Sequence, residues 1–275
     1  MNEPKNSAAD LTAKITKHIS NLAQMTDESL RSEAMLSFIK MCSRFHHYSV
    51  GNLWLILIQK PDATQVAGYH TWLQLHRYVR RGEKGIPILA PCVTRQNPDD
   101  KESEKVVRYF KVVYVFDISQ TEGEPLPDPP DWTSPERQVW LEDRLVQLAR
   151  DLGIVIKREK LSGTAQGKSS GGVITLTPEA GTTVLVHEIA HELMHQHAGI
   201  DRQTCEIEAE SVAAVVCSHF GLDNGHASNY LALWGADSKA VLSRLDRIRQ
   251  TVSQIITSLE AGADRFQYEN PEPRA

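Results

Sequence analysis

The sequence predicts an α+β protein of two domains, an N-terminal α+β module and a C-terminal, mostly helical domain with a small sheet. Three observations lead to this fold class. Apolar residues recur at helical spacing near both ends of the chain, and β-branched and aromatic residues gather in short runs between them. A proline-rich stretch then divides the 275 residues into two parts, each long enough for a domain of ordinary size.

The first domain, residues 1–127, opens with two expected helices, at 9–24 and 28–45, where apolar residues follow the helical period. A third expected helix is the apolar run YSVGNLWLILIQKP, which a proline ends. A short helix and a glycine turn should lead into a strand at 86–90. The run RYFKVVYVFDISQT has the composition of a central strand, and the polar stretch 94–105 before it should be an exposed hairpin loop.

The stretch QTEGEPLPDPPDWTSP, at about 120–135, holds five prolines and predicts a semi-rigid linker. The second domain, 135–260, should begin with a helix that runs to about Leu152. The runs GIVIKREK and GGVITLTP then read as strands joined by a flexible segment. Further helices are expected from Thr182, from Arg202 to Phe220 and over 237–260, and the tail 261–275 is expected to be disordered.

Charge is distributed unevenly along the chain. Residues 1–120 hold 16 basic and 12 acidic residues, a net charge of +4, whereas residues 121–275 hold 14 and 23, a net charge of −9. This asymmetry favours different partners for the two parts.

Four cysteines at unrelated spacings are typical of free thiols in a reducing cytosol. Because no apolar run is long enough to span a membrane and the N-terminus is not a secretory signal, we expect a cytoplasmic protein without a membrane partner.

The stretch VLVHEIAHELMHQH contains the HExxH motif His187-Glu188-Ile189-Ala190-His191. Residues four apart lie on one face of a helix, so both imidazoles can reach one Zn²⁺ ion. Glu188 is then placed to take a proton from the attacking water and to pass it to the leaving amine. His195 lies eight residues after His187, which is about 12 Å along a straight helix and too far for the same ion. We therefore expect His195 and His197 to be neighbours of the metal site or cleft residues.

The third metal ligand is expected in CEIEAESVAAVVC, which follows the motif. Glu206, Glu208 and Glu210 cannot all face one ion from a single helix, and the apolar spacing does not decide between them.

A resemblance bears on this choice. The segment from GVITLTP through HEIAHELMH to EIEAESVAAVV is similar to the ImmA/IrrE group of small zinc peptidase domains, over about 135–260. Glu206-Ile207-Glu208-Ala209-Glu210 resembles the ExxA(D/E/N) element of glutamate-type zinc peptidases. The resemblance implies that Glu206 is the ligand and that Glu210 orients a ligand histidine, with Glu208 as the rival ligand.

The same resemblance implies how a peptide substrate would be held. An edge strand beside the zinc commonly pairs with extended substrate, and GGVITLTP is the expected strand. Candidates for stabilising the oxyanion are Tyr230, His195 and His219. Glu192 is expected to be a solvated neighbour of the site.

In the first domain, cations alternate with aromatic rings between residues 72 and 84. Cations that track the backbone and exposed rings that stack on bases are typical of sequence-tolerant single-strand binding. A solvated cationic surface over a buried tryptophan is the alternative. The expected DNA contacts are Tyr48, Ser49, Asn52, Trp72, Arg77, Arg80, Arg81 and Lys84.

Several motifs occur here in a fixed order: YSxxN, QxPxAT, WxxLxRxV, RGEKGI and VFDISQT. Over roughly residues 10–127 they resemble the N-terminal domain of the ArdC antirestriction family, which implies single-stranded DNA binding. Together, the resemblances imply a zinc-dependent metalloendopeptidase that is held on single-stranded DNA and hydrolyses peptide bonds of an unknown protein substrate, in the service of a plasmid or phage (antirestriction or regulation). The alternatives are a non-proteolytic antirestriction protein that shields incoming DNA, with a structural or regulatory zinc domain, and a peptidase that cleaves a repressor.

Overall fold

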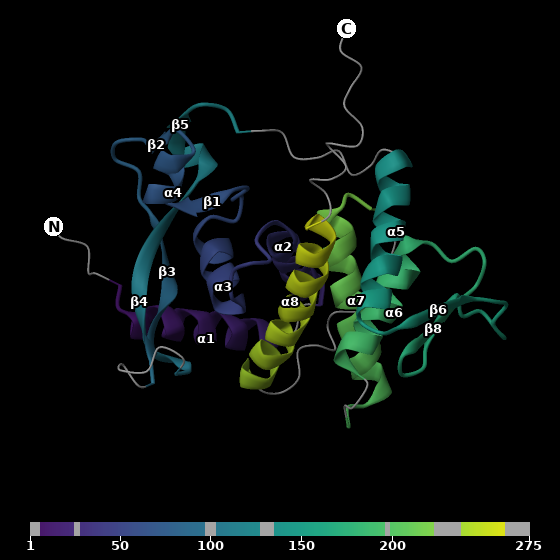
Figure 1. Ribbon diagram of the computed structural model, residues 1–275. Coiled ribbons are helices and arrows are strands. Elements are labelled where there is room, and N and C mark those ends of the chain that lie inside the picture. The colour runs from purple at the N-terminus through teal and green to yellow at the C-terminus, as the bar shows by residue number, and fades with distance from the viewer. Residues whose placement is uncertain are drawn as a thin grey trace, which may run out of the picture.

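The computed structural model describes residues 6–24, 28–96, 103–126, 135–195, 199–222 and 238–261. Its helices are α1 (Ala8–Gln24), α2 (Glu28–Arg44), α3 (Val50–Gln59), α4 (Tyr69–Gln74), α5 (Pro135–Asp151), α6 (Thr182–Met194), α7 (Arg202–His219) and α8 (Ser238–Glu260). Its strands are β1 (Val66–Gly68), β2 (Arg77–Val79), β3 (Ile86–Arg95), β4 (Lys105–Asp117), β5 (Thr121–Gly123), β6 (Val155–Arg158), β7 (Gly167–Ser169) and β8 (Val173–Leu176), with a 3-10 helix η1 (Ile118–Gln120). The mixture confirms the predicted α+β class (Figure 1).

The N-terminal sheet has the order β1-β4-β3, and β4 is its central strand, as its composition predicts. Both pairings are antiparallel. Strand β3 therefore leaves one edge unpaired, and α3 covers part of it. Asn52 on α3 donates to the carbonyl of Leu89 at 2.8 Å and accepts from its N–H at 2.9 Å. The side-chain amide thus replaces a neighbouring strand, which satisfies backbone groups that an open edge would expose.

The predicted linker begins later than its proline content indicates. Residues 118–123 form η1 and β5, and β5 pairs antiparallel with β2. Asp117 anchors this turn because its carboxylate accepts backbone hydrogen bonds from Thr64 at 2.7 Å and Ser119 at 2.9 Å. Residues 127–134, and all but the first residue of the tail expected at 261–275, lie outside the described part of the chain.

The C-terminal sheet has the order β6-β8-β7, so β8 is its central strand and β7 lies at an edge. This corrects the prediction that GGVITLTP, which contains β8, is the edge strand beside the site. The segment expected to be a flexible connection contains β7. Strand β7 packs against α6, the helix that carries the HExxH motif. Strand β7 has only three residues, GKS, and none of them is apolar. Its sequence therefore has no apolar pattern by which a strand could be recognised.

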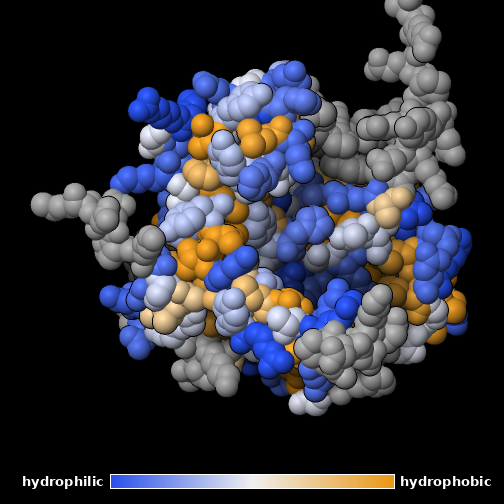
Figure 2. Space-filling model, turned by 60° about the vertical axis from the view of Figure 1, so that its left-hand side comes forward, coloured by the Kyte–Doolittle hydropathy of each residue, from blue (hydrophilic) through white to orange (hydrophobic). Residues whose placement is uncertain are grey.

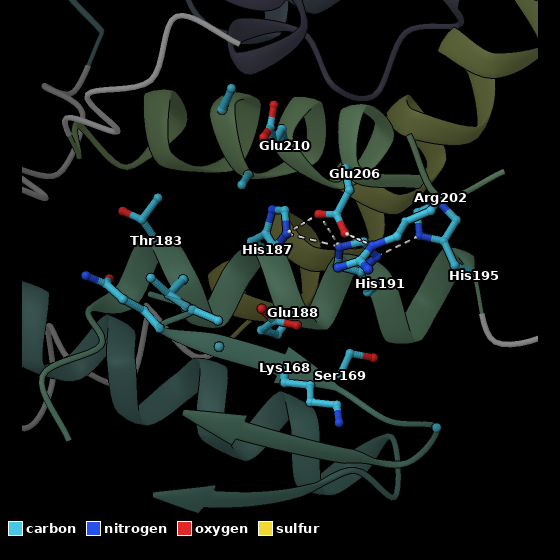
Figure 3. A pocket seen from close by; sticks show the side chains of 17 residues that line it. Lys168, Ser169, Thr183, His187, Glu188, His191, His195, Arg202, Glu206 and Glu210 are labelled. Atoms are coloured by element: carbon cyan, nitrogen blue, oxygen red, sulfur yellow. Dashed lines mark hydrogen bonds and ion pairs between the residues drawn. The ribbon is translucent and has the colours of Figure 1, made fainter. Parts of the chain in front are cut away.

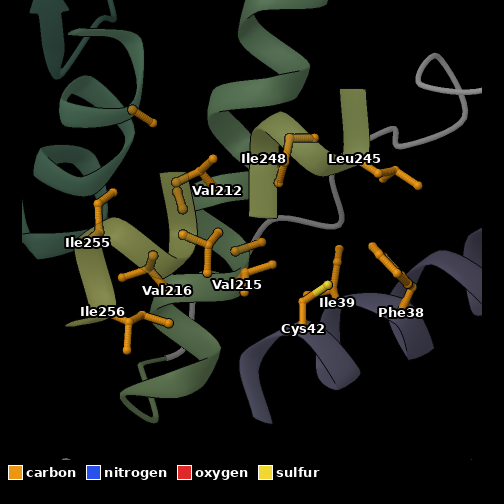
Figure 4. Packing of buried hydrophobic residues seen from close by; sticks show 14 of the residues in the cluster. Phe38, Ile39, Cys42, Val212, Val215, Val216, Leu245, Ile248, Ile255 and Ile256 are labelled. Carbon is orange, nitrogen blue, oxygen red and sulfur yellow. The ribbon is translucent and has the colours of Figure 1, made fainter. Parts of the chain in front are cut away.

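Buried side chains from both predicted domains form one hydrophobic cluster. Helix α8 packs against α1 and α3 of the first part and against α5, α6 and α7 of the second. Figure 4 shows α2 facing α7 and α8, with Phe38, Ile39 and Cys42 on α2, Val212, Val215 and Val216 on α7, and Leu245, Ile248, Ile255 and Ile256 on α8. The predicted boundary is therefore not a boundary of the hydrophobic core. None of the described helices is long and apolar enough to cross a membrane.

Candidate metal centre

The HExxH motif lies on α6, as its helical spacing predicts. Leu185 and Ile189 are buried on the core side of the helix, and this packing fixes how the helix is rotated. The histidines lie on another face, where Nε2 of His187 and Nε2 of His191 are 3.0 Å apart (Figure 3). Burial lowers the pKa of His187, and burial together with His187 lowers the pKa of His191 to about 4. Both rings are thus neutral at pH 7, the state in which imidazole binds a metal.

Helix α7 brings Glu206 to the two histidines. Its Oε2 lies 3.4 Å from Nε2 of His187 and 3.4 Å from Nε2 of His191. Tetrahedral ligands at about 2.0–2.2 Å from a zinc ion would be separated by roughly 3.3–3.6 Å. Both histidine–glutamate separations lie in this range, and the histidine–histidine separation of 3.0 Å is slightly shorter, so the three side chains fit one divalent ion after a small shift, with the fourth direction toward the cavity.

Glu208, the rival ligand, lies behind the cluster. It is fully buried, and its Oε2 is 3.0 Å from Nε2 of His195. Nδ1 of His195 in turn lies 3.1 Å from Nδ1 of His191. If Nδ1 of His191 donates to His195 and Nε2 of His195 donates to Glu208, Nε2 of His191 keeps its lone pair for the metal.

The prediction placed this orienting role on Glu210. Glu210 lines the cavity, but among the described residues no hydrogen bond joins it to His187 or His191. Its negative charge acts at longer range, since it opposes the effect of burial on the pKa of His187. The histidine–carboxylate pair His195–Glu208 is the contact that the sequence reasoning missed. Its signal was available, because His195 continues the four-residue series of the motif helix.

Glu188 is 6% exposed and lies between α6 and β7 (Figure 3). Burial, and then the nearby Glu206 carboxylate, raise its pKa to about 7. Gly167 on β7 is needed here, because an added Cβ would lie 2.5 Å from Oε1 of Glu188 and 2.7 Å from a methyl carbon of Val184. The small residue lets the strand approach the helix closely enough to enclose the carboxyl group.

Glu192 is 4% exposed, so the prediction of a solvated neighbour is wrong. It accepts hydrogen bonds from the hydroxyl of Ser169 at 2.5 Å and from the N–H groups of Gly171 at 3.0 Å and Gly172 at 2.6 Å. These bonds hold the turn between β7 and β8 against α6. Because Glu192 follows Glu188 by four residues, both face the same strand.

The cluster opens into a cavity of about 800 Å³. One wall is β7 with Lys168 and Ser169, and the other is α7 with Arg202, whose Nε is 3.6 Å from Oε1 of Glu206.

Of the candidate oxyanion residues, His195 lines the cavity. His219 does not, since it lies at the end of α7 and contacts Glu260. Tyr230 and His197 lie outside the described residues.

Four of the expected DNA contacts have structural roles in the N-terminal fold. Trp72 is 1% exposed and donates from its indole N–H to the carbonyl of Phe116 at 2.9 Å. Tyr48 donates to the carbonyl of Val66 at 3.2 Å, and Ser49 is the N-cap of α3. Asn52 covers the edge of β3. A fully buried ring cannot stack on bases, so the interpretation of Trp72 as an exposed ring is wrong.

The four expected cations are distributed around β2 and the turn after it. Arg77 bonds within the fold, to the hydroxyl of Thr121 at 2.9 Å and to the carbonyl of Glu124. Arg80 is partly exposed and forms an ion pair with Glu83 at 2.9 Å. Arg81 and Lys84 are exposed. DNA contact stays a prediction for these cations.

A second exposed surface, which the sequence reasoning did not single out, lies on β4. Val113 and Val115 pair with Ile88 and Ile86 on the core side of the sheet. Alternation then places Phe110 and Tyr114 on the opposite side, which we call the β4 face. Phe110 is 50% and Tyr114 48% exposed. Figure 2, in which the side of the molecule that carries β3 and β4 is turned forward, shows hydrophobic side chains among hydrophilic ones.

Comparison with known proteins gives a coherent result for the first part of the chain. Residues 5–116 match the family model for the N-terminal domain of the anti-restriction factor ArdC. An uncharacterized protein of Bacillus anthracis is 26% identical over 88% of this chain, but over 50% of its own length. The chain therefore spans about half the length of that relative.

Two solved structures of the antirestriction ArdC protein from the R388 plasmid are also similar. The Mn(II)-bound structure has a TM-score of 0.53 at 20% identity and covers 91% of this chain and 98% of that chain. The metal-free structure has a TM-score of 0.47 at 20% identity, with 78% and 86% covered. Residues 5–116 thus match the ArdC N-terminal domain family, and the chain shares the fold of the Mn(II)-bound ArdC structure.

Proposed function

We propose that the chain is a DNA-associated antirestriction protein that binds single-stranded DNA through its N-terminal part and holds a divalent metal ion between α6 and α7. The match of residues 5–116 to a domain of an anti-restriction factor carries this proposal. The similar ArdC structure was determined with Mn(II) bound. In this chain the donors are two imidazoles and a carboxylate, a set that suits Zn²⁺ and also accepts Mn²⁺.

Two exposed surfaces support binding of single strands. Arg81 and Lys84 supply cations near the exposed Tyr78 in the sequence, and the β4 face supplies Phe110 and Tyr114. Aromatic rings stack on bases of any type, and cations neutralise phosphates. The net charge of +4 over residues 1–120 has the sign that this requires.

The test of the DNA role is the affinity of the full chain for a labelled oligonucleotide as a function of salt. We expect Arg81→Glu to weaken single-strand binding several-fold and to lower the salt slope by about 0.7 for each lost phosphate contact. Lys157→Glu, which reverses an exposed charge on β6, is the matched control and should change little. Equal affinity of wild type for single- and double-stranded DNA would contradict the single-strand preference, and no affinity for either would contradict the DNA role.

A second candidate function is peptide hydrolysis, which the position of Glu188 favours. A structural zinc ion is usually closed by four protein ligands, whereas this cluster offers three ligands and an open cavity. A divalent ion bound there would act as a Lewis acid toward a peptide carbonyl and lower the pKa of water. Glu188 is the base beside it, with a pKa raised to about 7.

The surrounding residues provide the other requirements of such a site. Strand β7 has a free edge in its sheet and lines the cavity, so an extended peptide could pair with it. The buried pair His195–Glu208 fixes the orientation of His191. Glu188, after taking a proton, would pass it to the leaving amine.

Glu188→Gln separates the two candidates because it keeps the shape of the side chain and removes the base. If the chain is a peptidase, cleavage of candidate partner proteins, with and without single-stranded DNA, should fall by about 10²–10⁴-fold. Glu179→Gln, the same change at an exposed position outside the cavity, should leave cleavage intact. Full antirestriction in cells that carry Glu188→Gln would support the non-proteolytic function and contradict hydrolysis as its cause.

A further inference from the structure

Helices α2, α7 and α8 end close to one another, away from the cavity. His46 follows α2 by two residues, His219 is the last residue of α7, and Glu260 is the last residue of α8. Each offers one ligand atom, and these atoms lie within 4.8 Å of one another. None of the three lines the HExxH cavity. The cluster joins the segment that matches the ArdC N-terminal domain to the last two helices of the described structure.

His46 lacks a hydrogen-bond partner that its burial requires. The side chain is 3% exposed, and its Nδ1 is buried without a partner among the described residues. A buried polar atom left in this way costs roughly 1–3 kcal/mol, so such atoms are rare and need an explanation. Burial, followed by the neighbouring His47 and His219, lowers the pKa of His46 to about 4. The ring is neutral at pH 7 and keeps a lone pair for a cation.

The contacts of His219 show which of its ring nitrogens carries a hydrogen. Nδ1 lies 2.7 Å from the carbonyl oxygen of Ser43, which can only accept, so Nδ1 carries a hydrogen. Nε2 lies 2.9 Å from Oε1 of Glu260. In the neutral ring a lone pair would face the carboxylate, so the contact requires a positive charge between the two: either a proton on Nε2, which makes an ion pair with Glu260, or a bound cation. A histidine that donates to a backbone carbonyl and turns its other nitrogen to a carboxylate has the arrangement of a metal ligand.

Some of the charges around this cluster favour a bound cation and others disfavour one. Three helix C-termini meet here, and the negative ends of their dipoles favour a cation. The positive charge of Arg249 opposes one, although Arg249 is paired with Asp246, with 3.2 Å between Nε and Oδ1. His47 lies beside His46, with ring centroids 3.9 Å apart. Glu260, whose Oε1 lies 2.9 Å from Nε2 of His219, supplies the nearest negative charge.

We propose that His46, His219 and Glu260 form a second divalent-cation site, which fastens the N-terminal part of the chain to the ends of α7 and α8. Two imidazoles and one carboxylate suit Zn²⁺ or Co²⁺. Because such an ion would bind the folded state and not the unfolded chain, it would stabilise the contact between the two parts by mass action. This site is independent of the proposed DNA binding and hydrolysis.

The test counts ions. The metal-free full-length chain is titrated with Co²⁺, and binding is measured by visible absorption and calorimetry. In a second experiment the chain is incubated with Zn²⁺, and the zinc that stays bound after dialysis is measured. We expect two ions per wild-type chain, one in His187→Ala/His191→Ala, one in Glu260→Gln, and none when the three changes are combined. Glu260→Gln is conservative at a side chain that is 39% exposed, so folding should survive. His46→Gln provides a second variant of the site.

Two results would overturn the proposal. One is a single ion in wild type that only His187→Ala/His191→Ala removes. The other is a Glu260→Gln chain that is less stable but still binds as many ions as wild type, which would make His219–Glu260 an ion pair only. Glu179→Gln is the matched control, and it should bind two ions. A Zn²⁺-induced rise in Tm of His187→Ala/His191→Ala that Glu260→Gln abolishes would support the proposal.

Discussion

The metal cluster and the β4 face differ in how firmly their side chains are held. His191 is backed by His195 and Glu208, and the turn beside Glu188 is fixed by Glu192. Phe110 and Tyr114, by contrast, are about half exposed. A metal ion and a reaction require atoms fixed to within a fraction of an ångström, whereas stacking on bases of any type requires only accessible rings. The molecule thus combines a rigid site with an adaptable surface.

The largest expected effect concerns Trp72, which was predicted to belong to the adaptable surface and is instead part of the rigid fold. Trp72→Ala should lower the free energy of unfolding by about 3–5 kcal/mol, because it leaves a cavity beside β4 and removes the bond to Phe116. Urea denaturation followed by circular dichroism measures this. Tyr78→Ala, at an exposed ring, is the control and should cost far less stability. A Trp72→Ala chain as stable as wild type but unable to bind DNA would restore Trp72 to the DNA surface.

Glu208 tests how the rigid site is supported. Glu208→Gln should weaken metal binding by about 10–100-fold, because it weakens the acceptor that orients His195 and, through it, His191. Competition with a chromophoric chelator measures the affinity. Glu210→Gln is the matched comparison on the same helix and should have the smaller effect. The opposite ranking would return the orienting role to Glu210, as the resemblance to glutamate-type peptidases implies.

Phe110 tests whether the β4 face is a DNA surface. We expect Phe110→Ala to reduce the affinity for an oligonucleotide by about fivefold or more, as the loss of one stacked base does. Stability should change little, since the ring is half exposed. Fluorescence anisotropy at fixed salt measures the affinity. Val139→Ala, at an exposed apolar residue of α5, should leave it unchanged. Unchanged affinity in both variants would exclude stacking on Phe110.

The smallest expected effect is the pH dependence that Asp117 gives to the N-terminal sheet. Burial would raise the pKa of Asp117, but the hydrogen bonds from Ser119, Thr64 and Gln65 outweigh it and lower the pKa below 3.8. The carboxylate therefore contributes stability that is fully present above pH 3.8 and is lost as the pH falls through the folded-state pKa. The stability difference between wild type and Asp117→Asn should shrink over that acidic range. A difference that is constant with pH would contradict this.

The sequence by itself determined the α+β class, the long helices to within two residues, and the central position of β4. It also determined that His187 and His191 share a face of α6, because the helical period is a local property of the backbone. The approach of Glu206 to them was an expectation from resemblance, since the residues alone left Glu206, Glu208 and Glu210 open.

Only the tertiary structure decided which neighbours each side chain meets. It placed Glu208 behind His195, Glu192 on the turn after β7, and Trp72 under β4. It also brought the ends of α2, α7 and α8 together. These relations depend on strand pairing and on the packing of helices far apart in the chain, and neither is encoded in the spacing within a single segment.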